Sequence, residues 1–124
     1  MQNRIEVSTS TLKDNTLEFQ LVDNNIEISS MKVTGQMLVD SDNLSFIYIV
    51  ETNDEYVYLS FPTSVWGSLR KLIEDKLIPV LRQNGQEIVL EGIAEELTYL
   101  VQNIEGNANY GEEMVSMVEE TFIK

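Results

Sequence analysis

The side chains of this chain that could do chemistry are almost all carboxylates. Its 124 residues include 21 Asp and Glu against 8 Lys and Arg, with no histidine and no cysteine, and its formal net charge is −13. The missing residue types exclude histidine- or cysteine-based nucleophilic catalysis, zinc fingers, disulfides and imidazole proton transfer. Carboxylates alone leave two kinds of chemistry, which are glycosidic acid–base catalysis and the binding of Mg²⁺ or Ca²⁺.

One run of oxygen-bearing side chains, residues 40–43 (DSDN), is of the kind that begins a calcium-binding loop. An EF-hand loop also needs a glycine at its sixth position and a bidentate glutamate at its twelfth. Counted from Asp40, the twelfth residue is a glutamate, but the sixth is Ser45, and the residues after it are too apolar for a loop. We therefore favour a polar turn between strands, and we keep Asp40 and Asp42 as metal ligands in the alternative.

Three glutamates, Glu91, Glu95 and Glu96, form a second candidate group. Glu91 and Glu95 are four residues apart, which places them on one face of a helix if the helix begins early enough. Two carboxylates on one face could hold Mg²⁺ or supply an acid and a base. A solvated helix face is the interpretation we favour, and cations of the preceding helix could also match these charges within the chain.

The segment 106–113 (GNANYGEE) is the third candidate. A flexible segment before a helix can offer backbone N–H groups to an anion, but Glu112 and Glu113 already place negative charge there. Asn109 stands three residues before Glu112, which is the spacing of a capping box, so we expect Asn109 to cap the last helix. In the alternative, Asn107, Asn109 and Tyr110 contact a partner or a metal.

The elements that must position these candidates fall into two halves of different hydrophobic period. Residues 1–61 alternate with the period of a strand, and we expect five or six short strands in meander order. The clearest are residues 16–22, 25–29, 44–50 and 56–61, after a first strand that contains Ile5 and Val7. Residues 44–50 are apolar on both faces, which predicts a central covered strand, and Gly35 suggests a bulge or bend.

The second half begins with the helical period. Pro62 ends the last of these strands, and Thr63 or Ser64 is placed to cap a helix that runs to about Asp75. Two later stretches, residues 93–104 closed by Gly106 and residues 114–122, predict two more helices. We expect the aromatic residues of this region and of the last strand to pack in the core and on the sheet; they are Trp66, Tyr56 and Tyr58.

Residues 77–90 allow two interpretations. Asn84-Gly85 is a strong hairpin signal, so we favour a strand over residues 77–82, with Pro79 at its edge, paired with a strand over residues 86–90. The alternative continues the first helix over residues 77–85 with a kink at Pro79. The whole pattern predicts one α+β domain over residues 1–124. In it, an antiparallel sheet (a meander of about five strands plus a hairpin) is packed by about three helices on one face.

The acidic charge restricts the partners of the chain. Nucleic-acid binding needs Lys and Arg facing phosphate, and an anionic membrane surface would repel this chain as well. A basic protein or a divalent cation is favoured instead, unless the charge serves solubility alone. Residues 1–10 contain no apolar segment of an export signal, and no apolar run approaches the roughly 20 residues that cross a bilayer. We therefore expect a cytoplasmic protein, and we expect no cofactor.

Several segments of the chain are similar to those of a known family. They are residues 38–46 (LVDSDNLSF), 99–101 (YLV), 103–113 (NIEGNANYGEE) and 118–122 (VEETF). With these segments the chain resembles uncharacterised protein family 0738, a group of small bacterial proteins of similar length, over most of its extent. The resemblance implies a bacterial cytoplasmic protein. It carries no activity and no functional residues.

Two classes of function remain. In the first, which we favour, the chain is a small interaction or regulatory module that binds a basic protein surface through its acidic face, with aromatic residues as anchors. An acidic inhibitor that mimics phosphate toward a nucleic-acid-binding protein is a sharper form of this class. In the second, the chain is a carboxylate-dependent metal-binding protein or enzyme, but its carboxylate motifs are all generic. The sequence indicates no oligomeric state.

Overall fold

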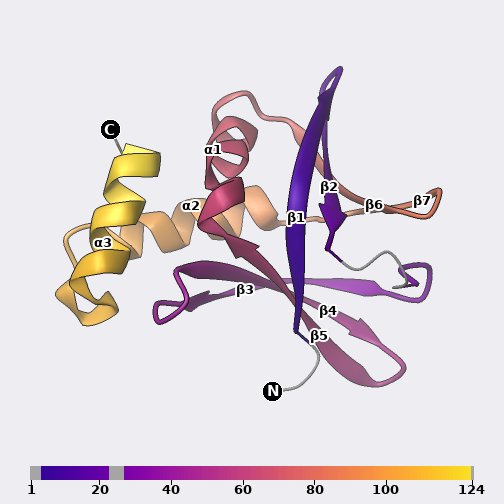
Figure 1. Ribbon diagram of the computed structural model, residues 1–124, viewed down its shortest axis with the longest axis horizontal. Helices are drawn as coiled ribbons and strands as arrows, with labels where there is room; N and C mark the ends of the chain where they lie inside the picture. Colours follow the sequence, from indigo (N-terminus) through magenta and orange to yellow (C-terminus); the bar gives the residue numbers. More distant parts are fainter. Residues whose placement is uncertain (1–3, 23–26, 124) are drawn as a thin grey trace.

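The computed structural model describes residues 4–22 and 27–123, which form a seven-stranded sheet with three α-helices beside it (Figure 1). The strands are β1 (Arg4–Lys13), β2 (Thr16–Leu21), β3 (Lys32–Asp40), β4 (Ser45–Thr52), β5 (Glu55–Pro62), β6 (Ile78–Gln83) and β7 (Gln86–Val89). The helices are α1 (Trp66–Glu74), α2 (Ile93–Ile104) and α3 (Glu112–Val118). Short 3₁₀ helices cover Thr63–Val65 and Ala108–Tyr110, and a π-helical turn covers Glu119–Ile123. The predicted α+β class is confirmed.

The sheet is mixed and its first five strands do not follow one another in space, so the predictions of a purely antiparallel sheet and of a meander are both wrong. Its strand order is β3-β4-β5-β1-β2-β6-β7, in which β1 lies parallel to β5 and β2 lies parallel to β6. β1 pairs with β5 through its first residues and with β2 through the rest, and the register shifts between Val7 and Thr9. The sheet curls around β1, so that β3, β4 and β5 form one wing and β2, β6 and β7 form the other (Figure 1). Alternation shows which face a residue points to, but not which strand lies alongside.

The β4–β5 hairpin forms as predicted, and β4 is the central covered strand of its wing. The first six residues of β4, Ser45–Val50, are all buried. Asn53 and Asp54 turn the chain with φ of 52° and 64°, the left-handed conformation that a tight hairpin turn requires. Tyr58 is half-buried in β5, whereas Tyr56, for which we expected packing on the sheet, is 55% exposed near the tip of the hairpin.

The strand predicted over residues 25–29 does not form in its described part. Glu27 and Ile28 lie outside regular structure and Ser29 lies in a turn, while residues 25–26 fall outside the described residues. Ile28 is nevertheless fully buried, so its hydrophobicity serves the core without a strand. The edge strand of this wing is β3, and Gly35 has a φ of +75° where the register with β4 shifts, which is the predicted bulge.

The hairpin of residues 78–89 also forms as predicted, and the alternative of a kinked helix is wrong. Asn84 and Gly85 turn it with φ of 52° and 80°, and Pro79 is the second residue of β6. Helix α1 begins later than expected, because a 3₁₀ helix takes up residues 63–65 first. Neither Thr63 nor Ser64 therefore caps it, and its N-cap is Val65, without a side-chain hydrogen bond.

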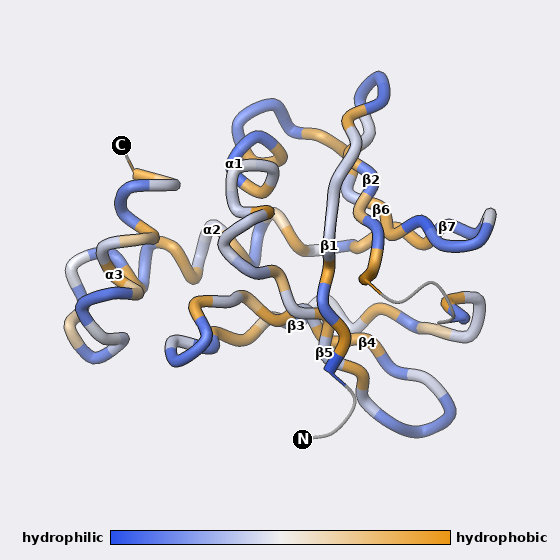
Figure 2. The backbone as a smooth tube through the Cα atoms, in the orientation of Figure 1, coloured by the Kyte–Doolittle hydropathy of each residue, from blue (hydrophilic) through white to orange (hydrophobic). Residues whose placement is uncertain are grey.

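The core lies between the curled sheet and the helices. The indole N–H of Trp66, a buried residue of α1, donates to the carbonyl of Phe61 at 2.9 Å. The Trp66 ring lies 5.0 Å from the ring of Phe46 and 5.9 Å from that of Phe122, centroid to centroid. Phe122 also lies 6.0 Å from Phe46, so the π-helical turn packs on α1 and β4. In Figure 2 the tips of the β1–β2 and β4–β5 hairpins are hydrophilic. The three helices lie together at the side of the sheet away from β7 (Figure 1).

Candidate functional site

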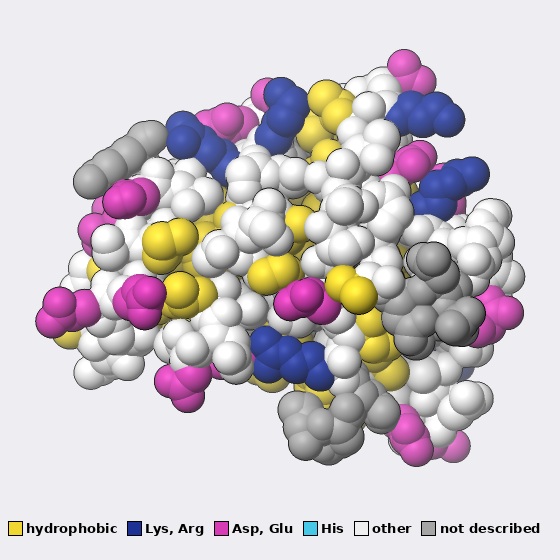
Figure 3. All heavy atoms as spheres, in the orientation of Figure 1, with side chains coloured by type: hydrophobic (Ala, Val, Ile, Leu, Met, Phe, Trp, Pro, Cys, Tyr) yellow, Lys and Arg dark blue, Asp and Glu magenta, His cyan; other side chains and the backbone are white. Residues whose placement is uncertain are grey.

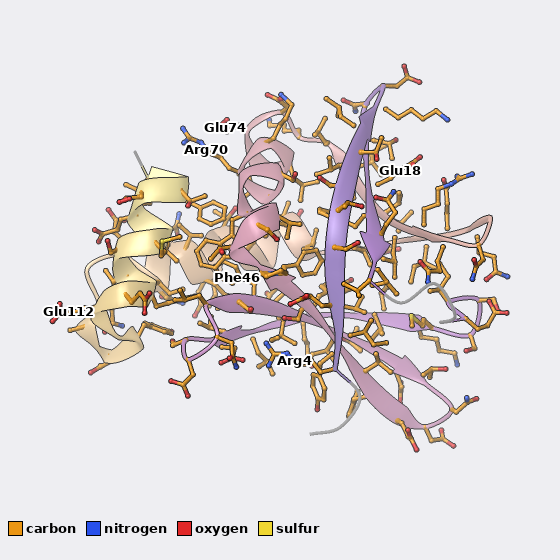
Figure 4. All side chains as sticks on the ribbon, in the orientation of Figure 1. Arg4, Glu18, Phe46, Arg70, Glu74 and Glu112 are labelled. Carbon is orange, nitrogen blue, oxygen red and sulfur yellow. The ribbon has the colours of Figure 1, made fainter. Side chains whose placement is uncertain are left out.

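The helical region at the end of the chain is strongly acidic. Residues 91–123 contain eight glutamates and no Lys or Arg. We call these eight residues the acidic helical surface; they are Glu91, Glu95, Glu96, Glu105, Glu112, Glu113, Glu119 and Glu120. Six of them are exposed, and Glu96 and Glu119 are half-buried. Carboxylates gather over the α3 end of the molecule in Figure 3, and Figure 4 shows Glu112 projecting there.

Helix α2 presents an exposed aromatic ring among these carboxylates. Its apolar stripe of Ile93, Leu97, Val101 and Ile104 is buried against the core. Tyr99 lies outside that stripe, four residues after Glu95, so both side chains are on the outer face of the helix. The Tyr99 side chain is 61% exposed, the largest exposed fraction among the large hydrophobic residues of the described chain. An exposed tyrosine beside carboxylates can stack on a Lys or Arg side chain.

The position of α2 is set by a junction with β3 and β4. Gly92, with a φ of +82°, lies beside Gly35, and a Cβ added to it would be in ordinary van der Waals contact with the Gly35 Cα at 3.5 Å. The hydroxyl of Tyr48 in β4 donates to the carbonyl of Glu91 at 2.6 Å. Burial raises the pKa of Tyr48 to about 12, and the nearby Glu91 carboxylate adds to the rise. Helix α2 begins at Ile93, after this junction.

The two glutamates expected to share a helix face are therefore separated. Glu91 belongs to the turn before α2, and only Glu95 lies in the first helical turn. The condition that the helix begins early enough is not met, because Gly92 occupies the N-cap in a left-handed conformation. Among the described residues no group of three or more carboxylates is placed to hold a metal ion.

The other candidate metal ligands, Asp40 and Asp42, lie at the end of β3 and in the turn that follows it. Both carboxylate oxygens of Asp40 accept hydrogen bonds, from the backbone N–H and side-chain amide of Asn43 and from the Arg4 guanidinium at 2.6 Å. The Asn43 side chain first, and Arg4 after it, lower the pKa of Asp40. Asp42 is exposed. This is the polar turn that the sequence favoured, held to β1 by Arg4 in a contact that the sequence did not indicate.

The segment between α2 and α3 is capped by a different asparagine from the one predicted. The side-chain oxygen of Asn107 accepts from the backbone N–H of Asn109 at 3.0 Å, and its amide donates to the carbonyl of Asn103 at 3.3 Å. The N-cap of α3 is Gly111, with φ +93° and no side-chain bond. The expectation for Asn109 was wrong because a 3₁₀ turn places it two residues before that cap. Tyr110 is half-buried against the core.

The cations of the first helix and its surroundings pair locally. Arg70 donates to Glu74 at 2.8 Å, and Lys71 lies 3.0 Å from Asp75. A third ion pair joins two neighbouring strands, Arg82 of β6 and Glu87 of β7. Within the part of the chain that the structure describes, no ion pair reaches the acidic helical surface, so the charge match with α1 that the sequence allowed does not form. Glu119 instead accepts a hydrogen bond from the backbone N–H of Gly106 at 2.9 Å, and six of the other seven glutamates are exposed to solvent.

Tyr99 is a candidate contact residue that the hydrophobic pattern of α2 already indicates, although it was not among the candidates predicted from the sequence. The stripe of residues 93, 97, 100, 101 and 104 leaves position 99 on the outer face, where a large aromatic residue serves no packing role.

In residues 4–22 and 27–123, the structure contains no helix of the length and apolar character that a membrane crossing requires.

Comparisons with known proteins agree on one family. The model of a "Family of unknown function (UPF0738)" matches residues 5–122. A UPF0738 protein of Bacillus cereus is 43% identical over 123 residues, covering 99% of this chain and 100% of the relative. A UPF0738 protein of Bacillus thuringiensis strain Al Hakam is 42% identical with the same coverage. No solved structure matches. The chain thus belongs to the UPF0738 family, whose function is unknown.

Proposed function

We propose that the protein is a cytoplasmic interaction module that binds a basic protein partner through the acidic helical surface. The observation that carries this proposal is the segregation of charge, since eight glutamates follow one another along residues 91–123 without a single Lys or Arg. Six are exposed, and within the described residues none of the eight is paired with a cation.

The physics of such a surface favours a cationic partner. Complementary potentials accelerate the encounter of two proteins and disfavour partners of the wrong sign. Tyr99 supplies what charge alone does not, an exposed apolar ring at which water can be excluded and affinity gained. Nucleic acids and anionic membranes would both meet repulsion at this surface.

The alternative of a carboxylate-dependent metal-binding protein or enzyme has less support. Asp40 is already bonded to Asn43 and Arg4, and Glu91 is separated from the helix that carries Glu95. No specific observation in the structure favours this second function.

Affinity purification followed by measurement of binding tests the proposal. The immobilised full chain is incubated with bacterial cytosol at about 0.05 M and about 0.3 M salt, which shortens the screening length about 2.4-fold. We expect a stoichiometric partner that is retained at low salt and lost at high salt. Retention independent of salt, or no stoichiometric partner, would contradict the proposal.

Two matched double variants of this chain, each measured for binding to the purified partner, show where on the chain the contact lies. Glu95→Gln with Glu112→Gln removes two charges from the acidic helical surface, and Glu27→Gln with Asp54→Asn removes two exposed charges elsewhere. At about 0.2–1 kcal/mol for each exposed ion pair, the first variant should weaken the complex between about twofold and thirtyfold. The second variant should leave the affinity nearly unchanged. Equal losses would show that only net charge matters and would overturn the assignment of the surface.

A further inference from the structure

Strand β4 is apolar on both faces, but the chain packs a second layer against only one of them. Phe46 and Tyr48 point to the core, where the Phe46 ring packs on Trp66 and the Tyr48 hydroxyl bonds to the turn before α2. Ile47 and Ile49 alternate with these residues and therefore point to the opposite face. Helices α1 and α2 and the other wing of the sheet lie on the core side (Figure 1). A strand that is apolar on both faces is typical of a sheet that is covered on both sides.

We call this opposite surface the outer sheet face; its apolar residues are Leu38, Ile47, Ile49, Tyr56 and Tyr58. Leu38 of β3 lies directly opposite Ile47, and Tyr58 of β5 lies directly opposite Ile49, so these side chains form one patch across three strands. Leu38 is 49% exposed, Tyr56 is 55% exposed, and Tyr58 is half-buried. The solvated face of an antiparallel sheet is normally polar, and a contiguous exposed apolar patch marks an interaction site.

One charged side chain crosses part of the outer sheet face. Arg4 of β1 donates to the Ser60 hydroxyl of β5 at 3.1 Å and to the Asp40 carboxylate of β3 at 2.6 Å (Figure 4). Because β5 and β4 lie between β1 and β3 in the sheet, this contact bridges both of them. Ser60 is accordingly buried. Leu38 at the β3 margin and Tyr56 near the β4–β5 turn remain accessible.

The outer sheet face carries almost none of the negative charge of the chain. Its strands direct two cations, Arg4 and Lys32, and three carboxylates, Glu6, Asp40 and Glu51, to this side. Arg4 is paired with Asp40, and Lys32 lies directly opposite Glu51. Nearly all of the net charge of −13 therefore lies elsewhere on the chain. This face selects neither a cationic nor an anionic partner.

A second copy of the chain fits these properties. Two outer sheet faces are both nearly neutral and apolar. When they pack sheet against sheet, the helices of the two copies, with the acidic helical surface, point away from each other. The repulsion that the net charge causes between copies is therefore smallest in this arrangement. A two-fold pair also covers both patches at once, so it leaves no apolar surface for further growth.

The size of the face sets the strength of such a pair. Strands β4 and β5 have eight residues each, and with β3 and the start of β1 the face is four strands wide. At about 3.3 Å per residue and about 4.8 Å between strands, it measures roughly 26 by 19 Å, or about 500 Å² in projection. A standard interface buries about 800 Å² of accessible surface on each partner. The contact is therefore at the small end of specific interfaces, and the pair should dissociate readily.

We propose that the outer sheet face is the contact of a reversible homodimer. The second copy supplies the layer that β4 lacks on this side, with Ile49 and Tyr58 near the middle of the contact and Leu38 at its margin. The inference goes beyond the proposed function, because it uses a different surface from the acidic helical surface and a different partner.

Sedimentation of the purified full chain tests the dimer. Between about 5 μM and about 1 mM protein, we expect a monomer–dimer equilibrium with a Kd of about 10 μM to 1 mM. Higher salt should strengthen the dimer, because it screens the repulsion between two chains of like net charge, whereas salt weakens the complex with a basic partner. A monomer at every concentration, or a dimer that salt dissociates, would overturn the inference.

Two matched substitutions locate the contact. Leu38→Lys and Val89→Lys each place a lysine at a similarly exposed apolar position of an edge strand, but only Leu38 belongs to the outer sheet face. Both add one positive charge, so the repulsion between copies falls equally. We expect Leu38→Lys to weaken the dimer at least about tenfold and Val89→Lys to weaken it less than about twofold. Equal losses, or a larger loss for Val89→Lys, would place the contact elsewhere and refute the assignment.

A second pair of substitutions separates this inference from the proposed function. Tyr56→Ser removes an exposed ring from the outer sheet face, and Tyr99→Ser removes one from α2. We expect Tyr56→Ser to weaken the dimer at least about fivefold without changing the binding of a basic partner, and Tyr99→Ser to do the reverse. Loss of the dimer in Tyr99→Ser alone would overturn the inference. Failure of the affinity purification contradicts the proposed function only, because the dimer is measured on the purified chain by itself.

Discussion

Removing the hydroxyl of Tyr48 tests the junction that positions α2. Tyr48 is fully buried, and its hydroxyl donates to the Glu91 carbonyl at 2.6 Å across 43 residues of sequence. The substitution Tyr48→Phe removes this bond and leaves a carbonyl without its protein partner, which costs about 1–2 kcal/mol of the free energy of unfolding. For a domain of this size, the loss corresponds to a decrease of roughly 3–10 °C in the melting temperature.

The pH dependence gives the same prediction a second readout. The folded-state pKa of Tyr48 is about 12, above its ordinary value of 10.0, so the neutral hydroxyl is the form that the fold stabilises. Its contribution is fully present below about pH 10. Between about pH 10 and 12 the unfolded chain ionises first, and this group then lowers stability by about 1.4 kcal/mol per pH unit. The stability gap between the wild type and Tyr48→Phe should therefore narrow as the pH rises above about 10, and it should close or reverse by about pH 12.

Urea unfolding followed by tryptophan fluorescence measures both effects, since Trp66 is the single tryptophan and lies in the core. Tyr99→Phe is the control, because it removes a hydroxyl from an exposed ring of α2 and should change stability by less than about 0.5 kcal/mol. An equal effect of the two substitutions, or a gap that stays constant from pH 7 to pH 12, would refute the reasoning about the junction.

Further predictions concern glycines, caps and charge. Gly92→Ala should destabilise by about 1 kcal/mol, because its φ of +82° is strained for a residue with a Cβ. Gly67→Ala, in open space within α1, should stabilise by about 0.5–1 kcal/mol, and chemical unfolding measures both changes. Asn107→Ala should lower the melting temperature, and Asn109→Ala should leave it unchanged. The pKa of Asp40 is lowered in the folded chain, so its ionised carboxylate stabilises the fold at pH values above the ordinary pKa of 3.8. The difference in stability between the wild type and Asp40→Asn should therefore shrink as the pH falls below 3.8, as measured in acid unfolding curves. At pH 7, moderate salt should raise the melting temperature, and millimolar Mg²⁺ or Ca²⁺ should add no more than an ionic-strength-matched sodium control; a large saturable shift would reveal an organised metal site.

The sequence by itself determined most of the individual elements. The alternation of residues 16–21, the apolar run of β4 and the turn residues at 53–54 and 84–85 all indicate the strands and hairpins that form. Helix α2 follows its apolar stripe, and the acidic helical surface can be counted directly from the sequence. These features act over a few residues, because hydrophobic period and turn conformation are properties of neighbouring positions.

The tertiary structure alone decided how these elements meet. The parallel placement of β1 beside β5 and of β2 beside β6 joins strands far apart in the chain, and no periodicity records it. The start of α2 depends on Tyr48 and Gly35, and the bond that holds Asp40 to β1 depends on Arg4. Each of these features requires contact between residues far apart in the sequence, so the free energy that selects it arises only in the assembled fold.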